Sequence, residues 1–301
     1  MRIALTGATG FVGRHTLGRL VRGGHEVRAW YRGDEKPEWN GAESEAVEWV
    51  RGDLDDADSA DRLVEGCEGV VHTALSRSGD SFMTEPSDPV VYFQTNVLGS
   101  LRLIDAAERA GTGRFVFISS GAVHQNVAED LPLDERHPLW PGSLYGASKA
   151  SVETLVHAYG LSGRLEIATL RPPSIVGVDD PVEKSKWFDL VRAMMRQESV
   201  DVSGGSKVVL VDDLARAIEL LLSTENAIAG QTFNCTSGFY STHRIAEMIG
   251  ELTASQSKLT GQPKTSAREM ETNKIEKLGM RFGGEPEIRR LLESLVEFVS
   301  F

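Results

Sequence analysis

The chain has 301 residues, of which 41% are hydrophobic and 25% are charged, as is ordinary for a folded globular protein. Its formal net charge of -12 excludes a protein built to bind the phosphate backbone of nucleic acids. The two cysteines are too few for a disulfide framework, and no apolar run approaches the ~18 residues of a membrane span, so we expect a cytoplasmic protein. The histidines form no cluster with the spacing of metal ligands, so we expect no metal site.

Short apolar runs alternate with helical patterns along the first part of the chain. Strands are predicted at residues 3–6, 26–31, 46–51, 69–72, 114–118 and 165–170. Helices such as 11–21 and 97–107 lie between them, with apolar residues at three- and four-residue spacing. This alternation predicts an α/β fold, a Rossmann-type doubly wound parallel sheet with helices on both faces.

The pattern loosens after Arg171, where two prolines interrupt it. Further elements are predicted at 208–211, 213–222, 242–252 and 286–299. We predict a Rossmann domain at 1–171, to which 205–235 returns, and a small C-terminal α/β lobe made of 172–204 and 236–301. Such a lobe would cover the carboxyl ends of the strands, where open α/β sheets bind their ligands.

A glycine-rich loop follows the first strand and leads at once into a helix. Its candidate cofactor-binding residues are Gly7, Thr9, Gly10, Phe11, Val12 and Gly13. Glycine allows a sharp turn and a close approach of backbone to a pyrophosphate, and the helix N-terminus favours its negative charge. An ordinary strand–helix turn is the alternative, but the strand–loop–helix order in the first βαβ unit favours a dinucleotide site.

The end of the second strand bears on which dinucleotide binds. NAD enzymes usually carry an acidic residue there, whereas this chain has Arg32, with Asp34 close by. A guanidinium can bind a 2′-phosphate through two hydrogen bonds, which favours NADP, while NAD stays open because Arg32 could be a solvated surface residue. After the third strand, Asp53 and Leu54 are expected to border the adenine, although Asp53 or Asp55 could instead cap a helix.

Tyr145 and Lys149 lie four residues apart at the start of a predicted helix and therefore share one of its faces. The lysine charge and the positive nicotinamide ring are together expected to lower the pKa of the phenol from about 10 towards neutrality, where tyrosine acts as a general acid or base. Ser120 follows the fifth strand, at the edge where reacting groups belong. Each residue alone has an ordinary explanation, but their order after a glycine loop favours a catalytic set.

Together these residues resemble the extended short-chain dehydrogenase/reductase family, which includes NAD-dependent epimerases and dehydratases. The resemblance covers nearly the whole chain and is strongest up to about residue 177. The motifs that carry it are the glycine loop, Val70-Val71-His72-Thr73-Ala74, Asn96-Val97-Leu98-Gly99-Ser100, Ser120, Tyr145 with Lys149, Leu170-Arg171-Pro172-Pro173-Ser174 and Val211-Asp212-Asp213-Leu214-Ala215.

The resemblance implies roles for these residues. Tyr145 would transfer the proton, Lys149 would tune it and bond the nicotinamide ribose, and Ser120 would hold the substrate oxygen. The remaining cofactor residues would be Thr73, Ala74 and Pro172. Candidate substrate residues are Asn96, His124 and Ser174; Asn96 could instead be a helix amide bonded to backbone, and His124 a polar surface group.

The leading hypothesis is an oxidoreductase that transfers hydride between NADP or NAD and a carbonyl or secondary alcohol of a small molecule. The alternative is a nucleotide-sugar epimerase or dehydratase with tightly bound NAD, which is weakened because Ser206-Lys207 stands where sugar-nucleotide members often carry an arginine. A protein that binds NADP without turning it over is disfavoured by the intact catalytic set. The resemblance also implies a homodimer through residues 90–110 and 144–159, which no sequence feature settles.

Overall fold

A computed structural model describes residues 1–39, 44–77, 79, 84–266 and 268–300. Its central sheet has seven parallel strands in the order β10-β6-β5-β4-β1-β2-β3. The strands are β1 (Arg2–Thr6), β2 (Glu26–Tyr31), β3 (Val47–Arg51), β4 (Gly69–His72), β5 (Arg114–Ile118), β6 (Ile167–Arg171) and β10 (Gln231–Asn234). The order reverses between β1 and β4, which confirms the predicted doubly wound sheet and places its ligand crevice at their carboxyl ends.

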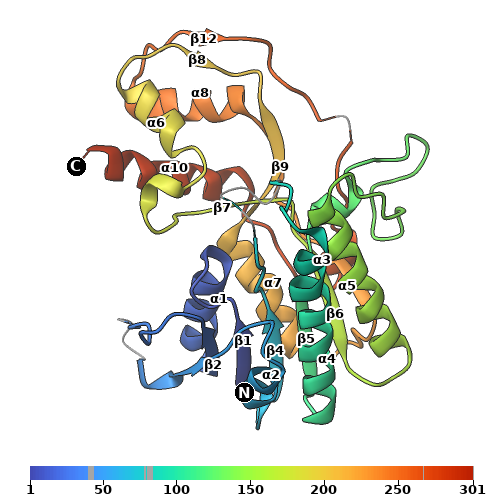
Figure 1. The fold of residues 1–301 in the computed structure, drawn as a ribbon. Helices are drawn as coiled ribbons and strands as arrows, with labels where there is room; N and C mark the ends of the chain where they lie inside the picture. Colours follow the sequence, from blue (N-terminus) through green and yellow to red (C-terminus); the bar gives the residue numbers. More distant parts are fainter. Residues whose placement is uncertain (40–43, 78, 80–83, 267, 301) are drawn as a thin grey trace.

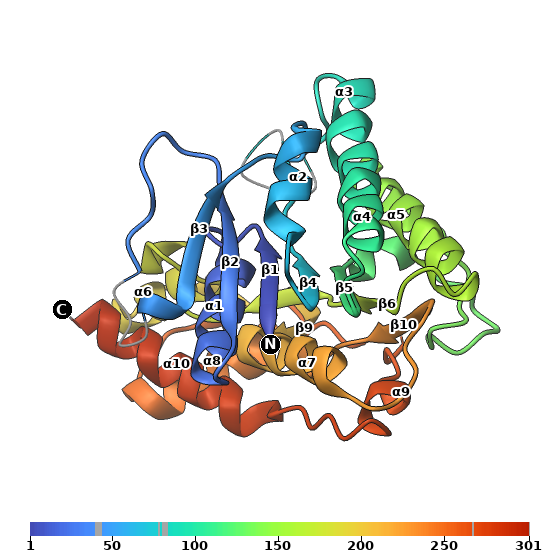
Figure 2. The same ribbon diagram turned by 90° about the horizontal axis from the view of Figure 1, so that it is seen from below.

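Helices cover both faces of this sheet (Figure 2). One face carries α2 (Ala57–Val64), α4 (Gly99–Arg109) and α5 (Leu144–Leu161), and the other carries α1 (Phe11–Arg22) and α7 (Val211–Ser223). A short helix α3 (Pro89–Phe93) and a π-helical turn η2 (Gln94–Leu98) run directly into α4. Strand-to-helix order therefore follows the predicted alternation, with boundaries that differ by a few residues.

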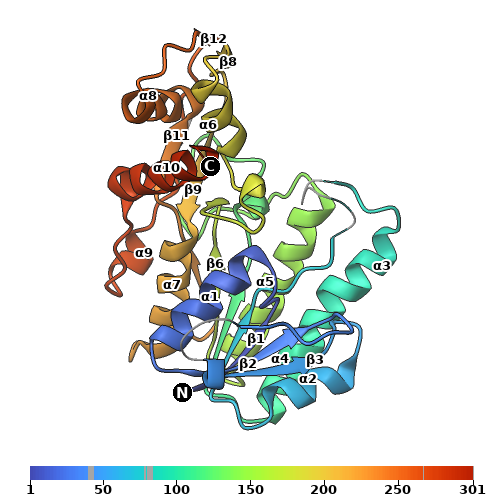
Figure 3. The same ribbon diagram turned by 90° about the vertical axis from the view of Figure 1, so that its left-hand side faces the viewer.

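A separate group of elements forms the lobe that lies beyond the carboxyl ends of the strands, away from the N-terminus (Figures 1 and 3). Its sheet has the order β11-β9-β7. The strands outside the central sheet are β7 (Ser174–Val176), β8 (Val200–Asp201), β9 (Gly205–Leu210), β11 (Gly238–Ser241) and β12 (Leu259–Thr260). The remaining helices are η1 (Ser44–Ala46), η3 (Gly121–His124), η4 (Val182–Lys184), α6 (Phe188–Met195), α8 (Thr242–Thr253), α9 (Asn273–Glu276) and α10 (Gly284–Ser300).

Three clusters of buried apolar residues hold these layers together. Two of them flank the central sheet, one against α1 and α7 and the other against α2, α4 and α5. The third lies within the lobe, between α6, α8 and α10. Ile275 and Met280, which fall in the segment predicted for the lobe, pack in the first sheet cluster. Among the described residues, no helix combines the length and the apolar character that crossing a bilayer requires.

Candidate active site

The glycine loop turns tightly against the end of β4. Gly7 has a φ of 71°, a left-handed conformation, and a Cβ placed on it would lie 2.6 Å from Thr73 Oγ1 and 2.8 Å from Ala74 N. A Cβ on Gly13 would overlap the Gly7 carbonyl oxygen. Only glycine therefore allows β1, β4 and α1 to approach this closely.

The N-terminus of α1 opens towards the same space. Its N-cap residue is Gly10, which supplies no side-chain hydrogen bond, and the first turn contains no acidic residue. Thr9 and Gly10 are exposed, while Phe11 and Val12 turn inwards to pack beside His15 and the first sheet cluster. The unfilled backbone N–H groups and the positive end of the helix dipole thus fit a dinucleotide pyrophosphate.

A chain of hydrogen bonds fixes the floor of the crevice. Ala74 N donates to Thr6 Oγ1 (3.1 Å), which lies 2.8 Å from His72 Nδ1, and His72 Nε2 lies 2.8 Å from Ser100 Oγ. Because Ser100 Oγ donates to the Asn96 carbonyl oxygen (2.5 Å), His72 must carry its proton on Nε2. Burial, with the nearby Lys149 charge, lowers the pKa of His72 to about 3. The imidazole is therefore neutral at neutral pH, and each hydrogen bond in this series keeps the same donor and acceptor.

The cofactor residues predicted after β2 and β3 differ in their exposure to solvent. Arg32 is exposed, and the Asp34 carboxylate accepts a hydrogen bond from Arg51 Nη2 at 2.8 Å. Asp53 Oδ1 accepts from Asp55 N (2.9 Å) in a local turn, and the N-cap of α2 is Asp56, one residue beyond the two candidates. Leu54 is 7% exposed, and its side chain packs against Gly99.

The predicted catalytic residues meet at the carboxyl end of β5. Ser143 caps α5 by accepting from Gly146 N (3.1 Å), which sets Tyr145 in the first turn of that helix. Tyr145 and Ser120 share a side-chain hydrogen bond. One turn further on, Lys149 Nζ donates to the Ile118 carbonyl oxygen at 2.7 Å and lies 4.9 Å from the centre of the Phe117 ring.

Burial dominates the pKa values of these groups. It raises the pKa of Tyr145, against the lowering effect of the Ser120 hydrogen bond, whereas the sequence analysis expected Lys149 and the nicotinamide ring together to lower it. Burial lowers the pKa of Lys149 to about 8, and Glu153 opposes that shift.

Pro172 and Ser174 continue β6 past the reacting residues. The Pro172 carbonyl oxygen accepts from Gly121 N (2.7 Å), which ties this segment to the residue after Ser120. Ser174 Oγ accepts from Lys186 Nζ (2.7 Å), which also donates to Ser206 Oγ (2.8 Å). Lys186 is a further candidate site residue that the sequence analysis missed, because its partners come from β7 and β9 and become its neighbours only in the folded lobe.

Asn96 is bonded to backbone, as the second of its two predicted interpretations states. Its Oδ1 accepts from Ser76 N (2.8 Å), and its Nδ2 donates to the carbonyl oxygens of Ser76 (2.9 Å) and Tyr92 (3.1 Å). The side chain is 4% exposed. It is therefore a buried amide that anchors the chain after β4, and these bonds leave its amide facing backbone rather than a substrate.

His124 is neither a substrate ligand nor a surface group, so both of its predicted interpretations are wrong. It is 5% exposed, its Nε2 accepts from Arg171 Nη1 (3.0 Å), and its Nδ1 donates to the Pro138 carbonyl oxygen (3.1 Å). Burial and the Arg171 charge lower its pKa to about 4. Both ring nitrogens are occupied, so the imidazole cannot exchange protons with a ligand.

Arg171 also forms a buried ion pair that the sequence analysis missed. Its Nη2 lies 2.6 Å from Glu153 Oε2, and the two side chains are 2% and 0% exposed. Glu153 lies four residues after Lys149, so it extends the Tyr145–Lys149 face of α5 by one turn. The pair therefore joins the helix that carries the reacting residues to β6.

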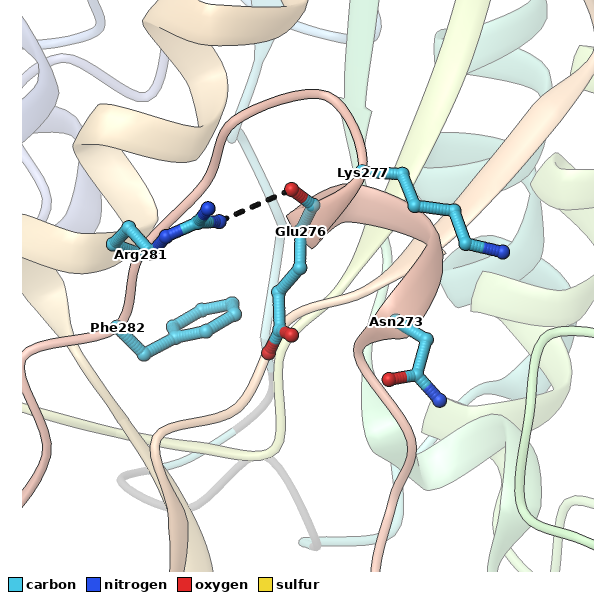
Figure 4. Close-up of a pocket in the computed structure, with 5 residues that line it drawn as sticks. All are labelled: Asn273, Glu276, Lys277, Arg281 and Phe282. Atoms are coloured by element: carbon cyan, nitrogen blue, oxygen red, sulfur yellow. Dashed lines mark hydrogen bonds between the residues drawn. The ribbon is translucent and has the colours of Figure 1, made fainter.

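A cavity of about 550 Å³ lies apart from these groups, on α9 and the segment that follows it. Its lining residues are Asn273, Glu276, Lys277, Arg281 and Phe282 (Figure 4). Within it, Arg281 Nη1 donates to the Glu276 carbonyl oxygen (3.2 Å), and Lys277 extends away from both. None of the predicted site residues lines this cavity.

Comparisons with known proteins identify the family of this chain. A family model described as the NAD dependent epimerase/dehydratase family matches residues 3–236. The dTDP-glucose 4,6-dehydratase of Streptomyces antibioticus is 35% identical over 179 residues, which are 57% of this chain and only 52% of the dehydratase. The vestitone reductase of Medicago sativa is 30% identical over 275 residues, which cover 82% of this chain and 80% of the reductase.

Among solved structures, the UDP-glucose 4-epimerase of Thermus thermophilus, a complex with NAD, matches with a TM-score of 0.77 at 25% identity. The match covers 99% of both chains. These relatives are by name a dehydratase, a reductase and an epimerase, so the likeness defines a family whose members differ in reaction.

Proposed function

The chain belongs to the NAD dependent epimerase/dehydratase family, and from that premise we propose that it is an NADP-dependent oxidoreductase that interconverts a carbonyl and a secondary alcohol of a small molecule. The observation that carries the proposal is the convergence of Ser120, Tyr145 and Lys149 at the carboxyl end of β5. The glycine loop and the α1 N-terminus supply the matching place for a dinucleotide pyrophosphate.

Each reacting residue has a distinct task in this proposal. Ser120 holds the substrate oxygen by a hydrogen bond, and Tyr145 gives that oxygen a proton in reduction or removes one in oxidation. Lys149 stabilises the phenolate left on Tyr145 through its positive charge. NADPH would supply the hydride to the substrate carbon in reduction, and NADP⁺ would take it up in oxidation. In reduction the C=O bond thus gains a hydride on carbon and the Tyr145 proton on oxygen.

Support for NADP over NAD comes from the end of β2. No acidic residue stands directly there, Arg32 is exposed, and the nearest carboxylate, that of Asp34, is bonded to Arg51. A carboxylate already paired with a guanidinium is a poorer acceptor for the ribose hydroxyls of NAD. The exposed arginine favours the extra negative charge of a 2′-phosphate.

Lys186 keeps the nucleotide-sugar epimerase or dehydratase as a second candidate. The ammonium is half-buried, bonds two serine hydroxyls and has no carboxylate partner within the described part of the chain. Burial lowers the pKa of Lys186, which an anionic ligand would reverse. Such a group beside Ser174 fits the diphosphate of a nucleotide sugar, or another acidic substituent of a simpler carbonyl compound.

The test is reduction of a panel of carbonyl compounds by cofactor-stripped protein with NADPH, followed at the nicotinamide absorbance band. We expect Tyr145→Phe to lower kcat by about 10²- to 10⁴-fold while NADPH binding is retained. The matched control is Tyr159→Phe, a buried tyrosine near the far end of the same helix, which should leave kcat unchanged. Full activity in Tyr145→Phe would remove the proposal. Protein that purifies with bound NAD and consumes none would favour the epimerase.

We also propose that the chain forms a homodimer through its long helices. Support comes from an apolar groove of about 420 Å³ along α3 and η2, lined by Pro89, Val90, Phe93, Gln94, Val97 and Leu98. Val90 and Leu98 are 66% and 45% exposed, which is costly for apolar side chains left in water. Light scattering of the purified protein, with Val90→Asp as the disrupting variant, tests it.

A further inference from the structure

The carboxyl ends of β2 and β3 lie side by side at the adenosine end of the crevice. Tyr31 and Arg51, the last residues of the two strands, are Cα partners, and Gly52 N donates to the Tyr31 carbonyl oxygen (3.1 Å). The segment that follows β2 carries Arg32 and Asp34, and the segment that follows β3 carries Asp53. Arg51 thus lies between Arg32, where the ribose of the cofactor is expected to bind, and Asp53, which is expected to border the adenine.

Arg51 reaches across to the segment after β2. Its Nη2 donates to Asp34 Oδ1 at 2.8 Å, and the two side chains are 63% and 95% exposed. Together with Arg32, this places two arginines at the carboxyl ends of β2 and β3, in segments that also carry Asp34, Glu35 and Asp53.

We propose that Arg51 is a second ligand of the cofactor 2′-phosphate, that it acts with Arg32, and that Asp34 occupies it until the phosphate displaces the carboxylate. The inference rests on the proposed NADP preference and adds the residue that enforces it. Arg51 would then determine the discrimination between NADP and NAD, since NAD presents only a hydroxyl at this position.

The exchange of partners is physically favourable. A salt bridge between two exposed side chains contributes little, because water competes for both charges. A 2′-phosphate carries up to two negative charges and can accept two parallel hydrogen bonds from a guanidinium, so it competes well against one carboxylate. Two arginines, one after β2 and one at the end of β3, can bind one phosphate from two sides, which a single arginine cannot do.

The test is calorimetric titration of cofactor-stripped protein with NADP, NAD and adenosine 2′,5′-bisphosphate, which carries the 2′-phosphate without a nicotinamide. We expect Arg51→Gln to weaken NADP and the bisphosphate by about 10-fold or more and to change NAD by less than about 2-fold. Arg62→Gln is the matched control, because Arg62 forms another exposed pair, with Asp56, and should change none of the three affinities.

The outcomes separate this inference from the function on which it rests. Loss of NADP affinity in Arg32→Ala with no effect of Arg51→Gln would overturn the role of Arg51 and leave the NADP preference standing. An equal loss for NADP and NAD in Arg51→Gln would also overturn it, because the residue would then act on the shared adenosine. Tighter binding of NAD than NADP by the unaltered protein would overturn the cofactor preference, and the role of Arg51 with it.

Discussion

Two arginine–carboxylate pairs of similar length lie at opposite ends of the crevice. Arg171 and Glu153 are 2.6 Å apart, and their side chains are 2% and 0% exposed. Arg51 and Asp34 are 2.8 Å apart, and theirs are 63% and 95% exposed. Because the chemical groups are the same, the difference between the two regions lies in the solvent around them.

That difference gives the two pairs different uses. A buried pair cannot lose one partner cheaply, since the other charge would stay in a medium that solvates it poorly, so Arg171 and Glu153 fix α5 to β6. An exposed pair can exchange its partner, because water stabilises either charge alone. Under the proposed function, the fold holds the helix of the proposed catalytic residues on a buried ion pair and leaves a replaceable pair where the cofactor would be selected.

The largest effect is expected when one partner of the buried ion pair is removed. We expect Glu153→Gln to lower the free energy of unfolding by about 3–5 kcal/mol, because Arg171 would keep an uncompensated buried charge. Urea unfolding measures it. The control is Arg192→Met, which breaks the exposed pair with Asp189 and should cost less than about 1 kcal/mol. Equal losses of unfolding free energy in the two variants would show that burial does not determine how much an ion pair contributes to stability.

The buried region should also respond to pH in a way that the exposed region does not. Burial lowers the pKa of Lys149 to about 8, whereas an unfolded chain holds a lysine near 10.4. Between those values the unfolded chain binds more protons than the native protein, so stability should rise with pH by about 1 kcal/mol per unit. Activity should fall over the same range, because Lys149 loses the charge that stabilises the phenolate.

Comparison with a variant that lacks Lys149 separates the effect of this lysine on stability from the effects of other buried lysines. Lys186 and Lys274 also have pKa values lowered by burial, and they contribute to the same slope. Lys149→Met removes only its own contribution, so the unfolding free energy of the unaltered protein should rise more steeply than that of the variant between pH 8 and 10. Parallel slopes would contradict the assignment of this titration to Lys149.

The parts of the site that local rules govern could be predicted from the sequence. The glycine loop needs a left-handed residue at Gly7, and the Tyr145–Lys149 spacing needs only one helix turn, so both depend on neighbours in the chain. The parallel sheet follows from the alternation of strand and helix patterns, with right-handed crossovers. These features explain why the sheet agrees with the prediction.

Contacts between distant segments could not be predicted in the same way. Glu153 meets Arg171 across 18 residues, and Lys186 meets Ser206 across 20, only after β6, β7 and β9 take their places. The surroundings of His124 depend on the chain around Pro138 folding over it. The burial that raises the pKa of Tyr145 is of the same kind, since the sequence shows the spacing to Lys149 but not the packing around the phenol.

The smallest effect is expected for a substitution in the exposed Arg51–Asp34 pair. We expect Asp34→Asn to tighten NADP binding by up to about 5-fold, because the phosphate no longer competes with a carboxylate for Arg51 and an exposed pair is worth at most about 1 kcal/mol. The unfolding free energy should stay within about 0.5 kcal/mol of the unaltered protein, as for most surface substitutions.

Ionic strength separates this explanation from a change in local structure. Screening shortens the reach of exposed charges from about 30 Å at 0.01 M salt to about 8 Å at 0.15 M, so the advantage of Asp34→Asn in NADP affinity should shrink as salt is added. Calorimetric titrations of both proteins at the two salt concentrations measure it. An advantage that is independent of salt, or that extends equally to NAD, would mean that Asp34 shapes the loop after β2 rather than competing for the guanidinium. The exposed pair would then be structural like the buried one, and solvent exposure would not be what distinguishes the two ends of the crevice.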